Sequence, residues 1–144
     1  MKAINERLWL PELEPIVRKA ADIIFDFYGK NLTCTDKAEG GFVTEADLAV
    51  EAFLIEQLRK LLPEAAIIAE ESGVDGDARY RWVIDPIDGT RAFITGLPVW
   101  GTLIGLYQNG RAVMGMMDQP FTGERFLSDG KSSFMKLRGG EAQV

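Results

Sequence analysis

The spacing of the apolar residues changes at Pro63, and this change constrains the fold more than any other feature of the sequence. Before it, apolar residues recur every three or four positions, which is the pattern of amphipathic helices. One helix is predicted from Pro11 to Tyr28, where Gly29 can terminate it. A second is predicted from Thr44, a favourable N-cap with an acid three residues later at Asp47, up to Pro63. We expect the buried faces to be Leu13, Val17, Ala20, Ile24 and Phe27 in the first helix, and Leu48, Ala52, Ile55, Leu58 and Leu62 in the second.

The segment between these helices, "NLTCTDKAEGGFVT", predicts two short strands around a Gly-Gly turn at residues 40 and 41. We expect it to be a mobile hairpin or loop at the surface. After Pro63, "AAIIAEES" and "RWVIDP" are short apolar runs that end in acids. Such runs are typical of buried strands whose polar ends emerge at one edge of a sheet.

Two further hairpins are predicted near the C-terminal end, around Asn109-Gly110 and Asp129-Gly130. Two helices followed by a mostly antiparallel sheet indicate an α+β architecture. Trp82 and Trp100 each lie inside an apolar run, so we expect both in the core.

The net charge and the single cysteine indicate which binding partners and which cellular compartment to expect. A chain of 144 residues with a net charge of -6 has the length of one domain and lacks the basic footprint that nucleic acids and anionic membranes attract. The N-terminal residues lack an apolar stretch of signal-peptide length, and a single cysteine fits a reducing cytoplasm. Because the chain has no histidine to deprotonate it, Cys34 is expected to be a small buried or half-buried residue rather than a nucleophile.

The most informative acids lie in "WVIDPIDGT", residues 82 to 90. Because Asp85 precedes Pro86, its strand is predicted to end there, and the turn that follows can bring Asp88 back beside it. Two carboxylates in contact require either a proton or a cation between them. Glu70, at the end of the neighbouring strand, could add a third carboxylate. In a chain without histidine, such an oxygen-rich set favours Mg²⁺ or Mn²⁺ over zinc.

Gly89 and Thr90 follow the acids and could open a short helix whose N-terminal N–H groups donate hydrogen bonds to a phosphate. A cation beside a phosphate would activate a water for attack, and Thr90 could orient that water. Structural explanations are open for each of these residues. Asp-Pro and Asp-Gly are ordinary turn residues, Asp47 can serve only as a helix cap, and Glu70 with Glu71 can be a solvated strand end. Asp36, Lys37 and Arg91 are most simply surface charges.

Three motifs together, "FVTEAD" (42–47), "AEES" (69–72) and "DPIDGT" (85–90), resemble the N-terminal motifs of the inositol monophosphatase family of Mg²⁺-dependent phosphomonoesterases. The resemblance implies that Glu70, Asp85 and Asp88 bind metal through their side chains, and Ile87 through its main-chain carbonyl. It implies that Thr90 and Asp47 activate the attacking water, and that Gly89 and Thr90 bind phosphate. The implied substrate contacts are Glu70, Ile87, Asp88, Gly89 and Thr90.

The resemblance also implies a layered αβαβα fold, of which residues 1–144 would be the N-terminal metal- and phosphate-binding half, without the C-terminal half. The continuation "DPIDGTRAFITGLPVWGTLIGL" and "DQPFTGERF" (118–126) look most like the histidinol-phosphate phosphatase branch. The implied function is Mg²⁺-dependent hydrolysis of a small phosphomonoester, histidinol phosphate, by a metal-activated water. The alternatives are an inositol monophosphatase and a truncated, non-catalytic metal- or phosphate-binding half-domain. A homodimer is the implied assembly.

Overall fold

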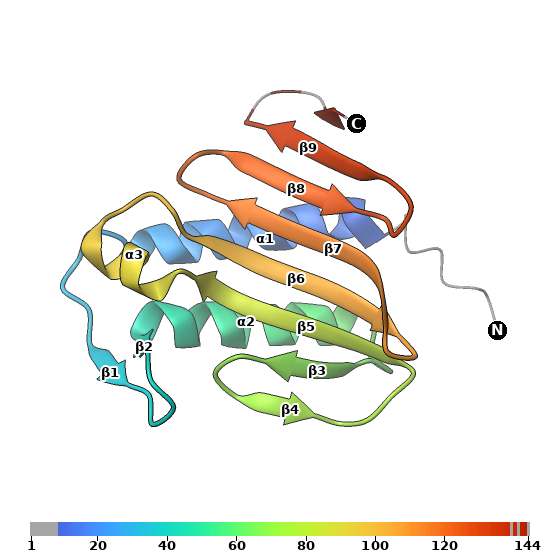
Figure 1. Ribbon diagram of the computed structural model, residues 1–144, viewed down its shortest axis with the longest axis horizontal. Coiled ribbons are helices and arrows are strands. Elements are labelled where there is room, and N and C mark those ends of the chain that lie inside the picture. The colour runs from blue at the N-terminus through green and yellow to red at the C-terminus, as the bar shows by residue number, and fades with distance from the viewer. Residues whose placement is uncertain (1–8, 139, 141, 144) are drawn as a thin grey trace.

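Two long helices pack on one face of an eight-stranded sheet in the computed structural model, which describes residues 9–138, 140, 142 and 143 (Figure 1). The strand order is β10-β9-β8-β7-β6-β5-β3-β4, and every neighbouring pair is antiparallel except β3 and β5. The predicted α+β architecture with a mostly antiparallel sheet is confirmed. The elements are α1 Trp9–Phe27, β1 Cys34–Asp36, β2 Phe42–Thr44, α2 Glu45–Leu61, β3 Ala66–Ala69, β4 Gly73–Asp75, β5 Tyr80–Asp88, α3 Thr90–Thr95, β6 Gly101–Gln108, β7 Arg111–Gln119, β8 Glu124–Ser128, β9 Ser133–Leu137 and β10 Ala142–Gln143.

Helix α1 buries the apolar stripe that its sequence predicts. Leu13, Val17, Ala20 and Ile24 are at most 1% exposed, whereas Phe27 at the end of the helix is only partly buried. The helix begins two residues before the predicted start at Pro11, which falls in the first turn, where a missing N–H breaks no hydrogen bond. None of the described helices is long and apolar enough to cross a lipid bilayer.

Helix α2 begins as predicted but buries a different stripe. Thr44 caps it through a reciprocal capping box with Asp47. The face against the sheet carries Ala46, Val50, Leu54 and Leu58, all fully buried, while the predicted Leu48 is 54% exposed and the predicted Ala52 is also exposed. Apolar residues lie on more than one side of this helix, so spacing alone allowed two stripes. The prediction was therefore wrong about the orientation of the first two turns.

The hairpins form at the predicted turns. Asn109 and Gly110, both with positive φ, join β6 to β7, and Asp129 closes the turn between β8 and β9 by accepting the amide N–H groups of Lys131 and Ser132. Trp82 and Trp100 are 0% and 1% exposed. Both are in the core, as predicted.

Strands β1 and β2 form a separate two-stranded hairpin beside the N-terminal end of α2 (Figure 1). The predicted Gly40-Gly41 turn is present, since both glycines have positive φ. All three residues of β1 are exposed, including Cys34. The expectation of a buried or half-buried cysteine was wrong, because this short strand lies outside the main sheet and no second layer covers it within the described part of the chain.

Candidate metal and phosphate site

A bulge in β5 turns Asp85 and Asp88 toward the same cavity. In a regular strand, residues three apart point to opposite faces of the sheet. Between these two residues the register with β6 shifts, so that three steps along β5 match two steps along β6. Pro86 and Ile87 are consecutive buried residues, whereas Asp85 is half-buried and Asp88 is exposed. The prediction that the strand ends at Asp85 was therefore wrong, because a bulge accommodates Pro86 within the strand.

Glu70 lies beside Asp85 because β3 and β5 run parallel. Its amide N–H donates to the carbonyl of Ile84 at 3.2 Å, immediately before Asp85. Burial raises the pKa of Asp85 to about 8, with further contributions from its hydrogen bond to Glu70 and from the charges of Glu70 and Asp88. The same hydrogen bond lowers the pKa of Glu70. The two carboxyl groups therefore favour sharing a proton over carrying two negative charges side by side.

The predicted ligands are neighbours but do not form an assembled coordination sphere. No three Asp, Glu, Cys or His side chains within the described part of the chain are gathered closely enough to hold a metal ion as they stand. Part of the reason is Lys37, whose ammonium group contacts Glu70 at 3.2 Å and Glu71 at 2.7 Å. Hydrogen bonding and attraction to these two carboxylates outweigh desolvation and raise the pKa of Lys37.

The donor atoms nevertheless fit a hard divalent cation. Glu70, Asp85 and Asp88 offer carboxylate oxygens, and Ile87 offers a main-chain carbonyl, which are the ligands that Mg²⁺ prefers. The Oδ1 atom of Asp85 is buried and has no hydrogen-bond partner in the part of the chain that the structure describes. Because a buried polar atom without a partner is costly, a cation at this point would relieve the cost.

Asp47 and Thr90 meet although 43 positions separate them. The Thr90 hydroxyl lies 3.3 Å from Asp47 Oδ1 and 3.2 Å from the Ile87 carbonyl, and it can donate to either. The other carboxylate oxygen of Asp47 accepts the amide and hydroxyl of Thr44 at 2.8 and 2.6 Å. Asp47 is fully buried, and burial raises its pKa despite these hydrogen bonds. Its carboxyl thus serves as a helix cap and as an acceptor for Thr90 at once.

The turn after β5 brings backbone close to the cavity. Gly89 has a φ of +91°, and a Cβ at this position would lie 2.9 Å from the carbonyl oxygen of Val99. Only glycine fits both the dihedral angle and the contact. The predicted short helix begins directly afterwards as α3, whose N-cap Gly89 provides no side-chain hydrogen bond to the first turn. All six predicted residues from Glu70 to Thr90 line a cavity of about 450 Å³, whose walls are Lys37, Gly40, Gly41, Phe42, Glu70, Asp85, Ile87, Asp88, Gly89, Thr90 and Arg91.

Three residues that sequence reasoning did not assign belong to this neighbourhood. Lys37 and Arg91 line the cavity, and the Arg91 guanidinium stacks over the ring of Phe42 at 5.4 Å. Glu51, on α2 and only 3% exposed, accepts the amide N–H groups of Glu71 and Ser72 at 2.8 and 2.9 Å. No local pattern marks these residues, because each acts through a segment distant in the sequence.

Comparison with known proteins gives one consistent result. A family model described as the inositol monophosphatase family matches residues 8–139. The chain is 40% identical over 111 residues to a bifunctional phosphatase IMPL2 of Arabidopsis thaliana, covering 75% of this chain and 32% of that protein. It is 34% identical over 133 residues to a histidinol-phosphatase of Chlorobaculum parvum, covering 90% of this chain and 50% of that protein.

Solved structures agree on the fold. The extragenic suppressor protein SuhB of Bartonella henselae superposes with a TM-score of 0.82 at 28% identity, over 88% of this chain and 51% of that one. The chain thus spans about half the length, or less, of the relatives that it matches.

Proposed function

Because the chain belongs to the inositol monophosphatase family, we propose that its cavity binds the phosphate of a small phosphomonoester together with Mg²⁺, or Mn²⁺ in its place, for hydrolysis by water. Histidinol phosphate is the proposed substrate. A histidinol-phosphatase among the relatives supports this choice, as does the likeness of the sequence after Thr90 to that branch. The observation that carries the proposal is Asp85, whose buried Oδ1 atom has no hydrogen-bond partner among the described residues and whose carboxyl group feels the negative charges of Glu70 and Asp88.

The chain's own residues would divide the work as follows. Glu70, Asp85 and Asp88, with the carbonyl of Ile87, would hold the cation. Gly89 lets the backbone approach the phosphate, and the first N–H groups of α3 can donate to its oxygens. When bound, Mg²⁺ would supply Lewis-acid polarisation of the phosphoryl group and a lowered pKa for water.

Thr90 and Asp47 would orient the attacking water. The Thr90 hydroxyl that donates to Asp47 leaves its oxygen lone pairs free to accept a hydrogen bond from water. Since burial raises the pKa of Asp47, this carboxylate is also a better proton acceptor than an exposed aspartate. The pair can therefore fix the water and begin to draw its proton away.

The test is release of inorganic phosphate from histidinol phosphate and from inositol monophosphate, each with and without Mg²⁺. Asp88→Asn should abolish the release, since an amide cannot replace a carboxylate as a cation ligand of equal charge. Asp88 is exposed, so the variant should keep its fold. Turnover that is unchanged by the substitution, or by EDTA, would refute the proposal. Faster release from inositol monophosphate would keep the chemistry and change the substrate.

A second candidate follows from the arrangement of the acidic residues. Because Lys37 pairs with Glu70 and the described acids are not gathered around one metal position, we propose as this second candidate a half-domain that binds metal and phosphate without turnover and pairs with another chain. Electron paramagnetic resonance, which measures Mn²⁺ binding, distinguishes the phosphatase from the non-catalytic half-domain. Saturable binding that Asp88→Asn weakens, without phosphate release, would favour the half-domain. Homodimer formation and a cytoplasmic location are further proposals, which sedimentation and fractionation would test.

A further inference from the structure

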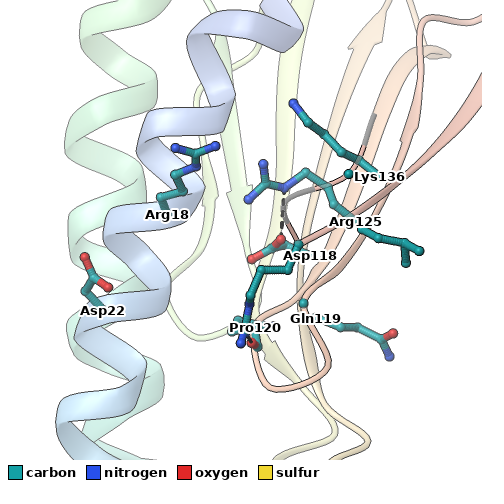
Figure 2. Close-up of a pocket in the computed structure, with 11 residues that line it drawn as sticks. Arg18, Asp22, Asp118, Gln119, Pro120, Arg125 and Lys136 are labelled. Atoms are coloured by element: carbon teal, nitrogen blue, oxygen red, sulfur yellow. Dashed lines mark hydrogen bonds and ion pairs between the residues drawn. The ribbon is translucent and has the colours of Figure 1, made fainter. Parts of the chain in front are cut away.

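A second cavity, of about 510 Å³, lies between α1 and the ends of β7, β8 and β9 (Figure 2). It shares no lining residue with the cavity around Asp85. Its charged lining residues are four cations, Arg18, Arg125, Lys136 and Arg138, and two acids, Asp22 and Asp118. Its size falls in the range of small-molecule sites. In a chain with a net charge of -6, this concentration of positive groups departs from the overall balance.

Two of the four cations are already neutralised. Arg125 contacts Asp118 at 2.9 Å, and these side chains are only 11% and 8% exposed. Glu14, at the rim, contacts Arg125 at 3.4 Å and Lys136 at 3.0 Å. These contacts form an internal network that fixes the β8 and β9 side of the cavity, so Arg125 and Lys136 need no other anion.

The other two guanidinium groups, those of Arg18 and Arg138, form no direct ion pair among the residues that the structure describes, although both attract the Asp118 carboxylate at longer range. Arg138 is held in place, because it donates to the carbonyl of Pro120 at 2.7 Å. Its stem lies so close to the turn at Gly123 that a Cβ there would come within 2.8 Å. Figure 2 shows Arg18 projecting from α1 across the cavity toward Arg125. Asp118, Asp22 and the rim residue Glu14 balance only part of the charge of the four cations, so an anion that enters the cavity meets a net positive lining.

We propose that this cavity is a second anion site, which binds a phosphate group, free or on a small metabolite, between Arg18 and Arg138. Guanidinium groups bind phosphate through paired N–H donors, and a tetrahedral anion presents oxygens to donors on opposite walls. Because Arg138 is already oriented, little side-chain entropy is lost on binding. The site is separate from the catalytic chemistry and does not depend on the function proposed above.

The experiment is a titration of the isotopically labelled protein with inorganic phosphate, and in a second arm with glycerol phosphate, at constant ionic strength and in EDTA. Because EDTA removes divalent cations, phosphate that binds through a metal ion does not contribute to the measured shifts. We expect saturable shifts of the Arg18 and Arg138 Nε–H signals and of the amides from Gln119 to Gly123. Arg18→Gln and Arg138→Gln should each weaken binding about tenfold, and both residues are exposed, so the variants should fold.

Arg111→Gln is the matched control, because Arg111 is exposed on the β6–β7 hairpin and lines neither cavity. It should bind like the unmodified protein. Saturable binding of either inorganic phosphate or glycerol phosphate would support the site. The ligand with the higher affinity shows whether the site prefers free phosphate or a phosphate ester. Shifts confined to Gly89–Arg91, shifts that never saturate, or equal affinities in all three variants would overturn the proposal.

Discussion

Replacing Glu51 by glutamine tests whether α2 holds the loop that carries Glu70. The Glu51 side chain is buried, and its two oxygens accept the amide N–H groups of Glu71 and Ser72 at 2.8 and 2.9 Å. These two amides follow Glu70 directly at the end of β3. In Glu51→Gln the remaining oxygen can accept only one of them, and the new NH₂ group faces the other donor.

The size of the effect follows from these two contacts. A hydrogen bond to a charged group contributes about 1.5–3 kcal/mol, and a buried donor without an acceptor costs about 1–3 kcal/mol. Losing one bond and stranding one N–H group should therefore lower the free energy of unfolding by roughly 3 kcal/mol. For a chain of this size that corresponds to about 6–12 °C in Tm.

The assay is urea unfolding together with amide hydrogen exchange at Glu71 and Ser72. Glu56→Gln is the matched control on the same helix, since Glu56 is exposed and its ion pair with Lys60 lies at the surface, a contact that should contribute under about 0.5 kcal/mol. In Glu51→Gln, exchange at Ser72 or Glu71 should rise more than exchange in the core of β5, and Mn²⁺ affinity should fall. If both variants unfold alike and exchange alike, Glu51 does not hold this loop.

The metal-free protein should lose stability as the pH rises from about 4 to about 8, because over this range folded Asp85 keeps a proton that the unfolded chain has released near its ordinary pKa of 3.8. Because the substituted asparagine does not titrate, the Tm of the unmodified protein minus the Tm of Asp85→Asn, both in EDTA, should fall over this range and level off above it, and a difference independent of pH would contradict the raised pKa. Gly89→Ala should cost roughly 2 kcal/mol or more, from the positive φ and the contact with the Val99 carbonyl. Gly96→Ala, also at positive φ but in open space, should cost only about 1 kcal/mol in urea unfolding, and equal losses would show that the Val99 contact is unimportant.

Local signals were sufficient for much of the fold. The capping box at Thr44 and the Asn109-Gly110 turn operate over three or four residues, so the sequence displays them directly. The buried face of α2 was harder to predict, because Leu48 and Val50 are both apolar and only packing against the sheet decides which of them is buried. The β1–β2 hairpin was predicted at the right residues. The exposure of Cys34 was not predicted, because it depends on whether another part of the fold covers β1.

The candidate site was predictable for a different reason. Asp85 and Asp88 were placed together on the argument that the strand must end at Pro86, whereas the structure joins them through a bulge inside the strand. The two aspartates do line one cavity, as predicted, but a bulge brings them there rather than the end of the strand. Lys37 and Glu51 could not be assigned, since each reaches the site from a segment whose position depends on the whole fold.

The bulge in β5 also determines how the site tolerates changes in chain length. It shifts the alternation of the pleat by one residue, so that Ile87 joins the core and Asp88 leaves it. Substitution of a neighbouring core residue can be absorbed by repacking, but a deletion of Pro86 would remove the two-against-one pairing that sets how Asp88 lies beside Asp85, and a deletion earlier in β5 would exchange the faces of the residues on one side of it. Variation in this segment should therefore be confined to residue identity, with its length held constant, whereas the exposed turns of the β1–β2 and β6–β7 hairpins have room for insertions.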